Sequence, residues 1–266
     1  MTLDAQAQSR FIGEVIKLIT GTFFIVIGLL ALVVAAIRRH AGGVRAVFWL
    51  GVWSALFGIQ RLNECSFVVA LLPHWMQVGV AYSHPLCTYL VLVAGLLTFR
   101  ELTLGAVRKF LTIMAAAAIV VAVLGIGTFL LTGKEYRLLH YNQILATVSL
   151  FALLPFLTLP SLRRKYGVLK DHRFLLAGYF IFGVEALLDN LLRPFGYQPY
   201  AIFSDLGFAA FILAIGYVSM ERVYSSERRL LSIENELAIA RQLQFSILPT
   251  STLKCATCAL RLSMSP

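Results

Sequence analysis

Three ionisable residues share one face of a helix inside an apolar stretch of the sequence. Glu185, Asp189 and Arg193 are spaced four apart, which places them on one side of an α-helix. A carboxylate within a bilayer costs roughly 2.5–3.5 kcal/mol on insertion scales, so such groups face the interior of a helix bundle and find partners. We expect either a ligand site here or internal pairs, chiefly Asp189 with Arg193.

Other polar residues lie near the ends of further apolar segments. Arg61, His84 and Asn142 lie near the end of the second, the start of the third and the start of the fifth segment. Asp205 begins the seventh, where we favour a helix N-cap for its side chain. With the three residues above, they predict an outward-facing pocket for a small polar or cationic ligand. The alternative is a set of internal pairs that fixes helix register.

No motif predicts a metal or catalytic site. His84 and His140 have no further ligands at metal-binding spacing, and lone histidines on spans are mostly hydrogen-bonded structural groups. Cys255 and Cys258 form an isolated CxxC, which is weak evidence for zinc or redox chemistry. We therefore expect no catalytic residue, metal or cofactor in this chain.

The composition is that of a polytopic membrane protein. Of 266 residues, 59% are apolar and 14% are charged, and the mean hydropathy is +0.81. Soluble domains have about 45–50% apolar and about 25% charged residues. The balance excludes a soluble enzyme for most of the chain, and it excludes disorder, which needs low hydrophobicity.

Apolar segments of about 20 residues, the length that crosses about 30 Å of hydrocarbon, recur through residues 1–220. They predict an all-α membrane bundle of about seven transmembrane helices, with short loops and no second folded domain. The expected spans are Leu18–Ile37, Val44–Asn63, Val78–Phe99, Phe110–Leu131, Tyr141–Pro160, Phe174–Leu192 and Ala201–Ser219.

The Lys and Arg residues predict the topology. The loops after the first, third and fifth spans carry 11 of them, against 6 on the opposite side with the N-terminal segment. Basic loops stay in the cytoplasm. We therefore expect an integral protein of the cell (inner) membrane, with the N-terminus outside and the C-terminus in the cytoplasm. Membrane topology thereby explains the net charge of +10. We expect the lipid bilayer as a partner and no nucleic acid.

Residues 221–249 differ sharply from the preceding segment: they are charged, lack Gly and are rich in helix formers. Six residues at alternating spacings of three and four, five of them apolar, predict a coiled-coil seam, and Pro249 ends the helix. The simplest interpretation is a parallel homodimeric stalk; the alternative is a single helix lying on the membrane. The seam residues are Leu230, Ile233, Leu237, Ala240, Gln244 and Ile247.

The end of this segment resembles a known linker. It is similar to the linker that precedes the catalytic domain in bacterial type 2C (PPM) serine/threonine phosphatases of the stage II sporulation protein E class. The matching residues are Glu236, Leu237, Ala240, Arg241, Gln244, Leu248 and Pro249. The resemblance implies a membrane sensor in residues 1–220 that regulates a phosphatase acting on partner-switching regulators.

The catalytic domain of that family is missing from this chain. Type 2C phosphatases resemble two-metal hydrolases whose Asp residues hold Mg or Mn around an activated water, and no Asp or Glu follows Glu236. We expect residues 250–266 to be the start of a truncated or frameshifted output domain or an irregular tail; otherwise the stalk docks on a separate protein. We hence expect a signal-transmitting module, with a small-solute or proton-coupled transporter as the alternative.

Overall fold

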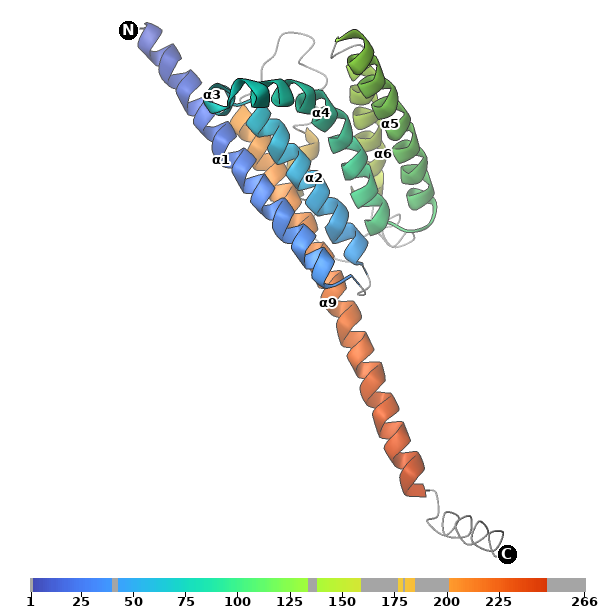
Figure 1. Cartoon of the computed structure of the whole chain (residues 1–266). Coiled ribbons are helices and arrows are strands. Elements are labelled where there is room, and N and C mark those ends of the chain that lie inside the picture. The colour runs from blue at the N-terminus through green and yellow to red at the C-terminus, as the bar shows by residue number, and fades with distance from the viewer. Residues whose placement is uncertain are drawn as a thin grey trace, which may run out of the picture. The chain divides into compact units, whose positions relative to one another are not determined.

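A computed structural model of the chain describes residues 2–39, 43–133, 138–158, 177–178, 180–184 and 201–247. The described part forms helices joined by short turns and contains no strand (Figure 1). Its helices are α1 (Thr2–Ile37), α2 (Val44–Asn63), α3 (Ser66–Leu71), α4 (His74–Leu102), α5 (Gly105–Thr132), α6 (Leu139–Thr158) and α9 (Ala201–Ile247). The expected all-α class is confirmed.

Several helices are long and apolar enough to cross a membrane. Among the described residues, four segments meet this condition, and they belong to α1, α4, α5 and α9. The expected span Val44–Asn63 is helical as α2, and the described part of Tyr141–Pro160, up to Thr158, is helical as part of α6. Neither is among these four. The expected sixth span, Phe174–Leu192, falls mostly outside the described residues.

The chain divides into two compact units, Met1–Val223 and Tyr224–Pro266. Helix α9 is a single helix of 47 residues that contributes to both. The expected boundary near residue 220 therefore falls inside a helix. The reason is local: the change from apolar to charged residues at Glu221 brings no Pro or Gly, so nothing interrupts the backbone hydrogen bonds.

An aromatic cluster forms the centre of the first unit. Trp53 of α2 contacts Phe99 of α4 and both Phe208 and Phe211 of α9, with ring centroids 5.4–6.1 Å apart. Phe24 of α1 packs edge-on against Phe208 at 5.1 Å. All of these rings are buried, and edge-on aromatic pairs add to the free energy of burial. The cluster ties α9 to α1, α2 and α4.

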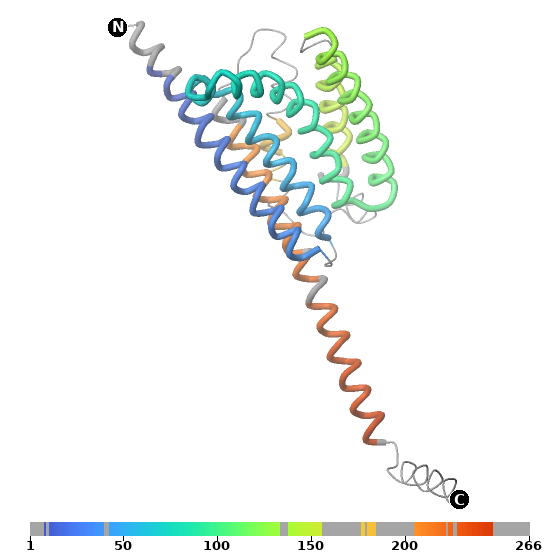
Figure 2. The backbone as a smooth tube through the Cα atoms, viewed as in Figure 1, coloured from blue at the N-terminus to red at the C-terminus, as the bar shows by residue number. Residues whose placement is uncertain are grey.

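Glycines allow α1 and α2 to lie side by side (Figure 2). Gly21 and Gly28 on α1 face Gly58 and Gly51 on α2. A Cβ on Gly58 would lie 2.6 Å from the carbonyl oxygen of Gly21, and one on Gly28 would lie 2.7 Å from the Ala55 nitrogen. Small residues at such positions let two backbones approach closely.

Gly58→Ala is expected to destabilise the first unit by about 1–3 kcal/mol, because the new methyl group meets backbone and forces the two helices apart. Gly127→Ala on α5 is the matched control, since a Cβ there meets nothing within 4 Å. That change should be neutral or stabilise by about 0.5–1 kcal/mol through helix propensity. Thermal unfolding in detergent micelles measures both, and equal midpoints for the two variants would contradict the close packing.

Candidate functional site

The first unit has a partly open cavity of about 370 Å³ that is lined mainly by α2, α4 and α6, with Phe208 from α9. On α2 the lining residues follow helical spacing from Trp53 to Glu64, so one face of this helix forms a wall. On α4 the lining runs from His84 to Phe99. Glu64 lies beside His84 and Trp53 beside Phe99, so the two walls are antiparallel and the cavity follows the helix axes.

The two ends of the cavity differ in chemistry. One end is lined by polar side chains: Gln60, Glu64, His84, Thr88, Asn142 and Gln143. The other end is lined by large apolar side chains: Trp53, Leu96, Phe99, Leu153, Phe182 and Phe208. A few convergent polar groups next to an apolar wall are typical of a small-molecule binding site.

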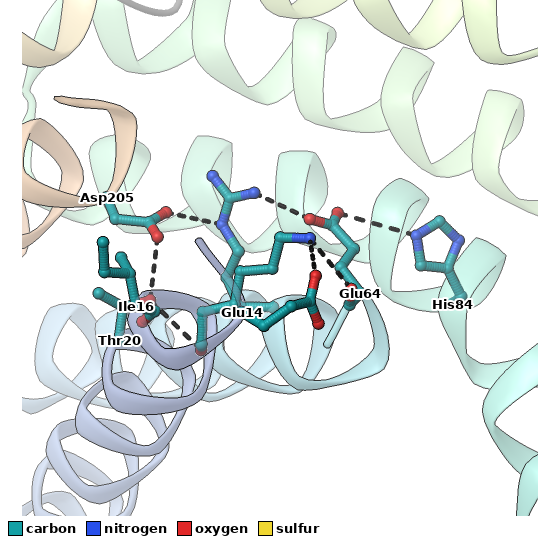
Figure 3. Close-up of polar contacts among 8 residues, drawn as sticks. Glu14, Ile16, Thr20, Glu64, His84 and Asp205 are labelled. Atoms are coloured by element: carbon teal, nitrogen blue, oxygen red, sulfur yellow. Dashed lines mark hydrogen bonds and ion pairs between the residues drawn. The ribbon is translucent and has the colours of Figure 1, made fainter. Parts of the chain in front are cut away.

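An ion network lies at the polar end and includes Asp205, Glu64 and His84 (Figure 3). Arg61 joins its two carboxylates, Asp205 and Glu64. The Arg61 Nε lies 2.7 Å from Asp205 Oδ1, and its Nη1 lies 2.9 Å from Glu64 Oε2. The Asp205 carboxylate is 1% exposed. The Nε contact is an ion pair without the angle of an aligned hydrogen bond. The Thr20 hydroxyl lies 2.9 Å from both Asp205 Oδ2 and the Ile16 carbonyl oxygen, and donates its one proton to either.

A second set of contacts fixes the N-terminal part of α1 to the α2–α3 connection. Glu14 accepts hydrogen bonds from the hydroxyl and the backbone N–H of Ser66. Lys17 Nζ lies 3.0 Å from Glu14 Oε1 and donates to the Glu64 carbonyl oxygen at 3.2 Å. These contacts hold the backbone at Glu64, and so they position its side chain at the cavity mouth.

The Glu64 carboxyl, in the connection between α2 and α3, is held in its ionised form. Burial raises the pKa of Glu64, but the interaction with His84 and the positive charge of Arg61 outweigh it and lower the pKa from 4.5 to about 2. His84 Nε2 lies 3.8 Å from Oε1, an ion-pair distance rather than a hydrogen bond. Glu64 is thus a fixed negative charge whose two oxygens already have cationic or polar neighbours.

Acid should weaken this contribution in a defined window. Because the pKa of Glu64 is lower in the folded state, its stabilisation of about 3 kcal/mol is present above pH 4.5 and disappears as the pH falls toward 2. Unfolding of Glu64→Gln in detergent should show lower stability than the parent at pH 7 and a shrinking difference below pH 4.5. A difference that stays constant down to pH 2.5 would contradict the ionised state.

Two buried polar atoms at the cavity wall lack a hydrogen-bond partner within the described part of the chain. They are Asn142 Oδ1 and Trp53 Nε1. The Asn142 side-chain nitrogen donates to the Thr88 carbonyl oxygen at 3.4 Å, which leaves its oxygen free. Buried polar groups nearly always have partners, so water or a ligand in the cavity is the expected one.

The structure locates four of the seven residues that the sequence suggested for a polar cluster. Arg61, His84 and Asn142 lie at the polar end of the cavity or beside it, and Asp205 pairs with Arg61. The N-cap expected of Asp205 is wrong, since α9 begins at Ala201 and this carboxylate contacts other helices instead. Three members lie outside the described residues: Glu185, Asp189 and Arg193.

Sequence reasoning missed Glu14 and Lys17 because it started the first span at Leu18, and it treated Thr20 as part of the uncharged run of that span. Helix α1 begins at Thr2, and the helix-forming composition of residues 4–17 was the signal. It also missed Gln60 and Gln143. Their spacing from Glu64 and Asn142 does not show whether their side chains face the cavity or the lipid. Within the described residues no group of three or more His, Cys, Asp or Glu could hold a metal ion. The CxxC of Cys255 and Cys258 falls outside them.

The chain was compared with protein-family models, curated proteins and solved structures, and none matches. The likeness to the phosphatase linker consequently stays a prediction. Of its seven residues, Glu236, Leu237, Ala240, Arg241 and Gln244 lie within α9. Leu248 and Pro249 fall outside the described part of the chain.

Proposed function

We propose that the chain is a membrane-embedded sensor that transmits occupancy of its cavity through α9 to a cytoplasmic output. One observation carries the proposal. Helix α9 supplies a buried ion-pair partner, Asp205, and a cavity wall, Phe208, and continues without a break to Ile247. A ligand that contacts Phe208 therefore touches the same helix that carries the stalk segment.

The ion network offers a means of coupling. Asp205 lies one turn before Phe208 on α9 and is held by Arg61 of α2 and Thr20 of α1. A ligand can shift α9 only if it binds two positions of the helix with different affinity. Contact with Phe208 provides that difference, because moving the ring moves α9 against the helices that hold Asp205.

The stalk segment, residues 224–247 of α9, has the pattern of a parallel dimer. Leu230, Ile233 and Leu237 of the expected seam are 52–55% exposed within one chain. On the same heptad, Arg229 and Glu236 take g positions, and Glu234 and Arg241 take e positions. Parallel pairing sets Arg229 against Glu234 of the second copy and Glu236 against Arg241, both of opposite charge.

Two copies in one membrane have the same orientation, so a parallel arrangement is also the one that the membrane imposes. Other apolar residues of the segment, such as Leu231 and Ile239, are 58–59% exposed and lie off the seam. They provide internal controls for the heptad assignment.

The output that we propose is a serine/threonine phosphatase, based on the linker residues from Glu236 to Gln244. Its Mg or Mn site would belong to the phosphatase domain, and partner-switching regulators would be the proteins on which it acts. The excess of Lys and Arg in alternate loops supports an inner membrane protein with this segment in the cytoplasm.

Cysteine cross-linking tests the dimer in membranes. In a background in which the four native cysteines are replaced by alanine, Ile233→Cys should form a disulfide dimer within minutes under mild oxidation. Leu231→Cys, equally exposed but two positions away on the helix, should cross-link at least tenfold more slowly. Equal rates would contradict the seam, and no dimer at either site would contradict the stalk.

A further inference from the structure

The cavity is elongated and matches the shape of a long, thin ligand. Its α2 wall covers the 11-residue step from Trp53 to Glu64, and its α4 wall covers the step from His84 to Phe99. At 1.5 Å per residue these walls are about 16 and 22 Å long. With a volume of about 370 Å³, near the lower limit of ligand sites, the cavity is long and narrow.

The apolar end selects the body of the ligand. Trp53 is buried with its ring against Phe99 and Phe208, and Phe182 lies 5.4 Å from Phe208. No charged side chain lines this end among the described residues. An alkyl chain or an aryl ring gains free energy here by leaving water, and a polar body would lose its hydration without compensation.

The charged side chains at the polar end limit the kind of head group that can bind, because they already have partners within the protein. The Glu64 carboxylate has Arg61 and His84 as neighbours, and Asp205 has Arg61 and Thr20. A cationic head would compete with Arg61 for the Glu64 carboxylate, and an anionic head would meet that carboxylate at the cavity wall. A charge buried without a partner is costly, so this arrangement disfavours both.

Neutral hydrogen-bonding groups remain for the head group. Gln60, Thr88 and Gln143 line this end, and the unpartnered Oδ1 of Asn142 is an acceptor at the same wall. A hydroxyl donates one hydrogen bond and can also accept, and so it can pair with both the NH₂ group and the oxygen of amide side chains.

We propose that the cavity binds an uncharged, elongated amphiphile, with a hydroxyl head at the Asn142 end and an apolar chain or ring against Trp53. This deepens the proposed function and rests on it only for the role of binding in sensing. The shared chemistry is a long-chain alcohol or a phenol with an apolar substituent, supplied either from the bilayer or from the aqueous phase.

Tryptophan fluorescence tests the binding directly, because Trp53 is one of three tryptophans in the chain. In the full chain with Trp49→Phe and Trp75→Phe, in phosphatidylcholine vesicles, 12-bromododecanol should quench Trp53 in a saturable manner. Unlabelled dodecanol should reverse the quenching by competition. Linear quenching without competition would overturn the proposal.

Matched variants locate the binding. Ala146→Leu, which extends into the cavity from α6, should weaken the apparent affinity at least tenfold. Ala116→Leu makes the same change at an exposed position on α5 and should leave it unchanged. Equal effects of the two changes would show that the alcohol binds elsewhere and would overturn the assignment.

Charged analogues and dilution complete the test. At equal mole fraction in the bilayer, 12-bromododecanoate and 12-bromododecyltrimethylammonium should bind at least tenfold more weakly; equal or tighter binding would overturn the neutral head group. Half-saturation that scales with mole fraction in lipid indicates a bilayer source, and half-saturation that scales with aqueous concentration indicates uptake from water. Quenching reports the cavity alone, so saturable binding with an unresponsive stalk would refute the sensor function and keep the site.

Discussion

Arg61→Met is expected to destabilise the first unit more than any other single change in the ion network. Arg61 is the shared partner of two carboxylates. Its removal leaves Asp205, 1% exposed, with the Thr20 hydroxyl as its one remaining hydrogen-bond partner among the described residues. Removing one partner of a buried ion pair costs about 3–5 kcal/mol, because the remaining charge stays buried without compensation. The stacking of the guanidinium over the Phe57 ring, 5.0 Å from its centroid, is lost as well.

A second change should restore part of this loss. In Arg61→Met with Asp205→Asn, the buried charge is gone and Thr20 can still donate to the amide oxygen, so we expect about half of the stability to return. The control is Arg108→Met, whose side chain is 46% exposed and lies 3.7 Å from Glu101; it should cost less than about 1 kcal/mol. Chemical unfolding in detergent micelles measures all three. If Arg61→Met and Arg108→Met cost the same, the central ion pair is not structural.

Leu237→Asp is expected to abolish the dimer contact of the stalk segment. Leu237 lies at the centre of the seam and is 55% exposed in one chain. Burying a leucine contributes about 1.5–3 kcal/mol, and a dimer loses two of them and gains two facing carboxylates. The dissociation constant should rise at least about 100-fold.

Ile239→Asp is the matched control, since Ile239 is 58% exposed and lies two residues away, off the seam. It should change the dissociation constant less than about threefold. Energy transfer between labelled copies in micelles, followed by dilution, measures both variants. Equal weakening by the two aspartates would indicate that the segment buries its apolar residues in another way, such as on the membrane surface.

Helix content and most helix positions could be predicted from the sequence. Long apolar runs locate α4 and α5 within a few residues, because a helix satisfies all backbone hydrogen bonds within one segment of a bilayer-spanning chain. The beginning of α1 could not be found this way, since residues 2–17 include four charged side chains and hydropathy marks the span rather than the helix. The same limit hides the joining of the last span and the stalk segment in α9.

The sequence predicted the depth in the membrane at which the residues of the candidate site lie, but not which of them pair with one another. Positive charge and apolar length suggested that Arg61, His84 and Asn142 lie near one face of the membrane. The partner of Arg61 is 144 positions away at Asp205, and only the packing of α9 against α1 and α2 brings the two together. A local explanation, the N-cap, was available for Asp205 and proved wrong because the helix starts one turn earlier.

We propose that occupancy of the cavity alters the stalk segment. Gln242→Cys, at an exposed position, can carry a spin label in the chain without native cysteines. In phosphatidylcholine vesicles, pulsed electron paramagnetic resonance then measures the distance between the labels of the two copies. We expect that adding dodecanol shifts this distance distribution by several ångströms, and that the shift is lost in Ala146→Leu but kept in Ala116→Leu. A distribution that stays the same while dodecanol saturates Trp53 would contradict transmission through α9.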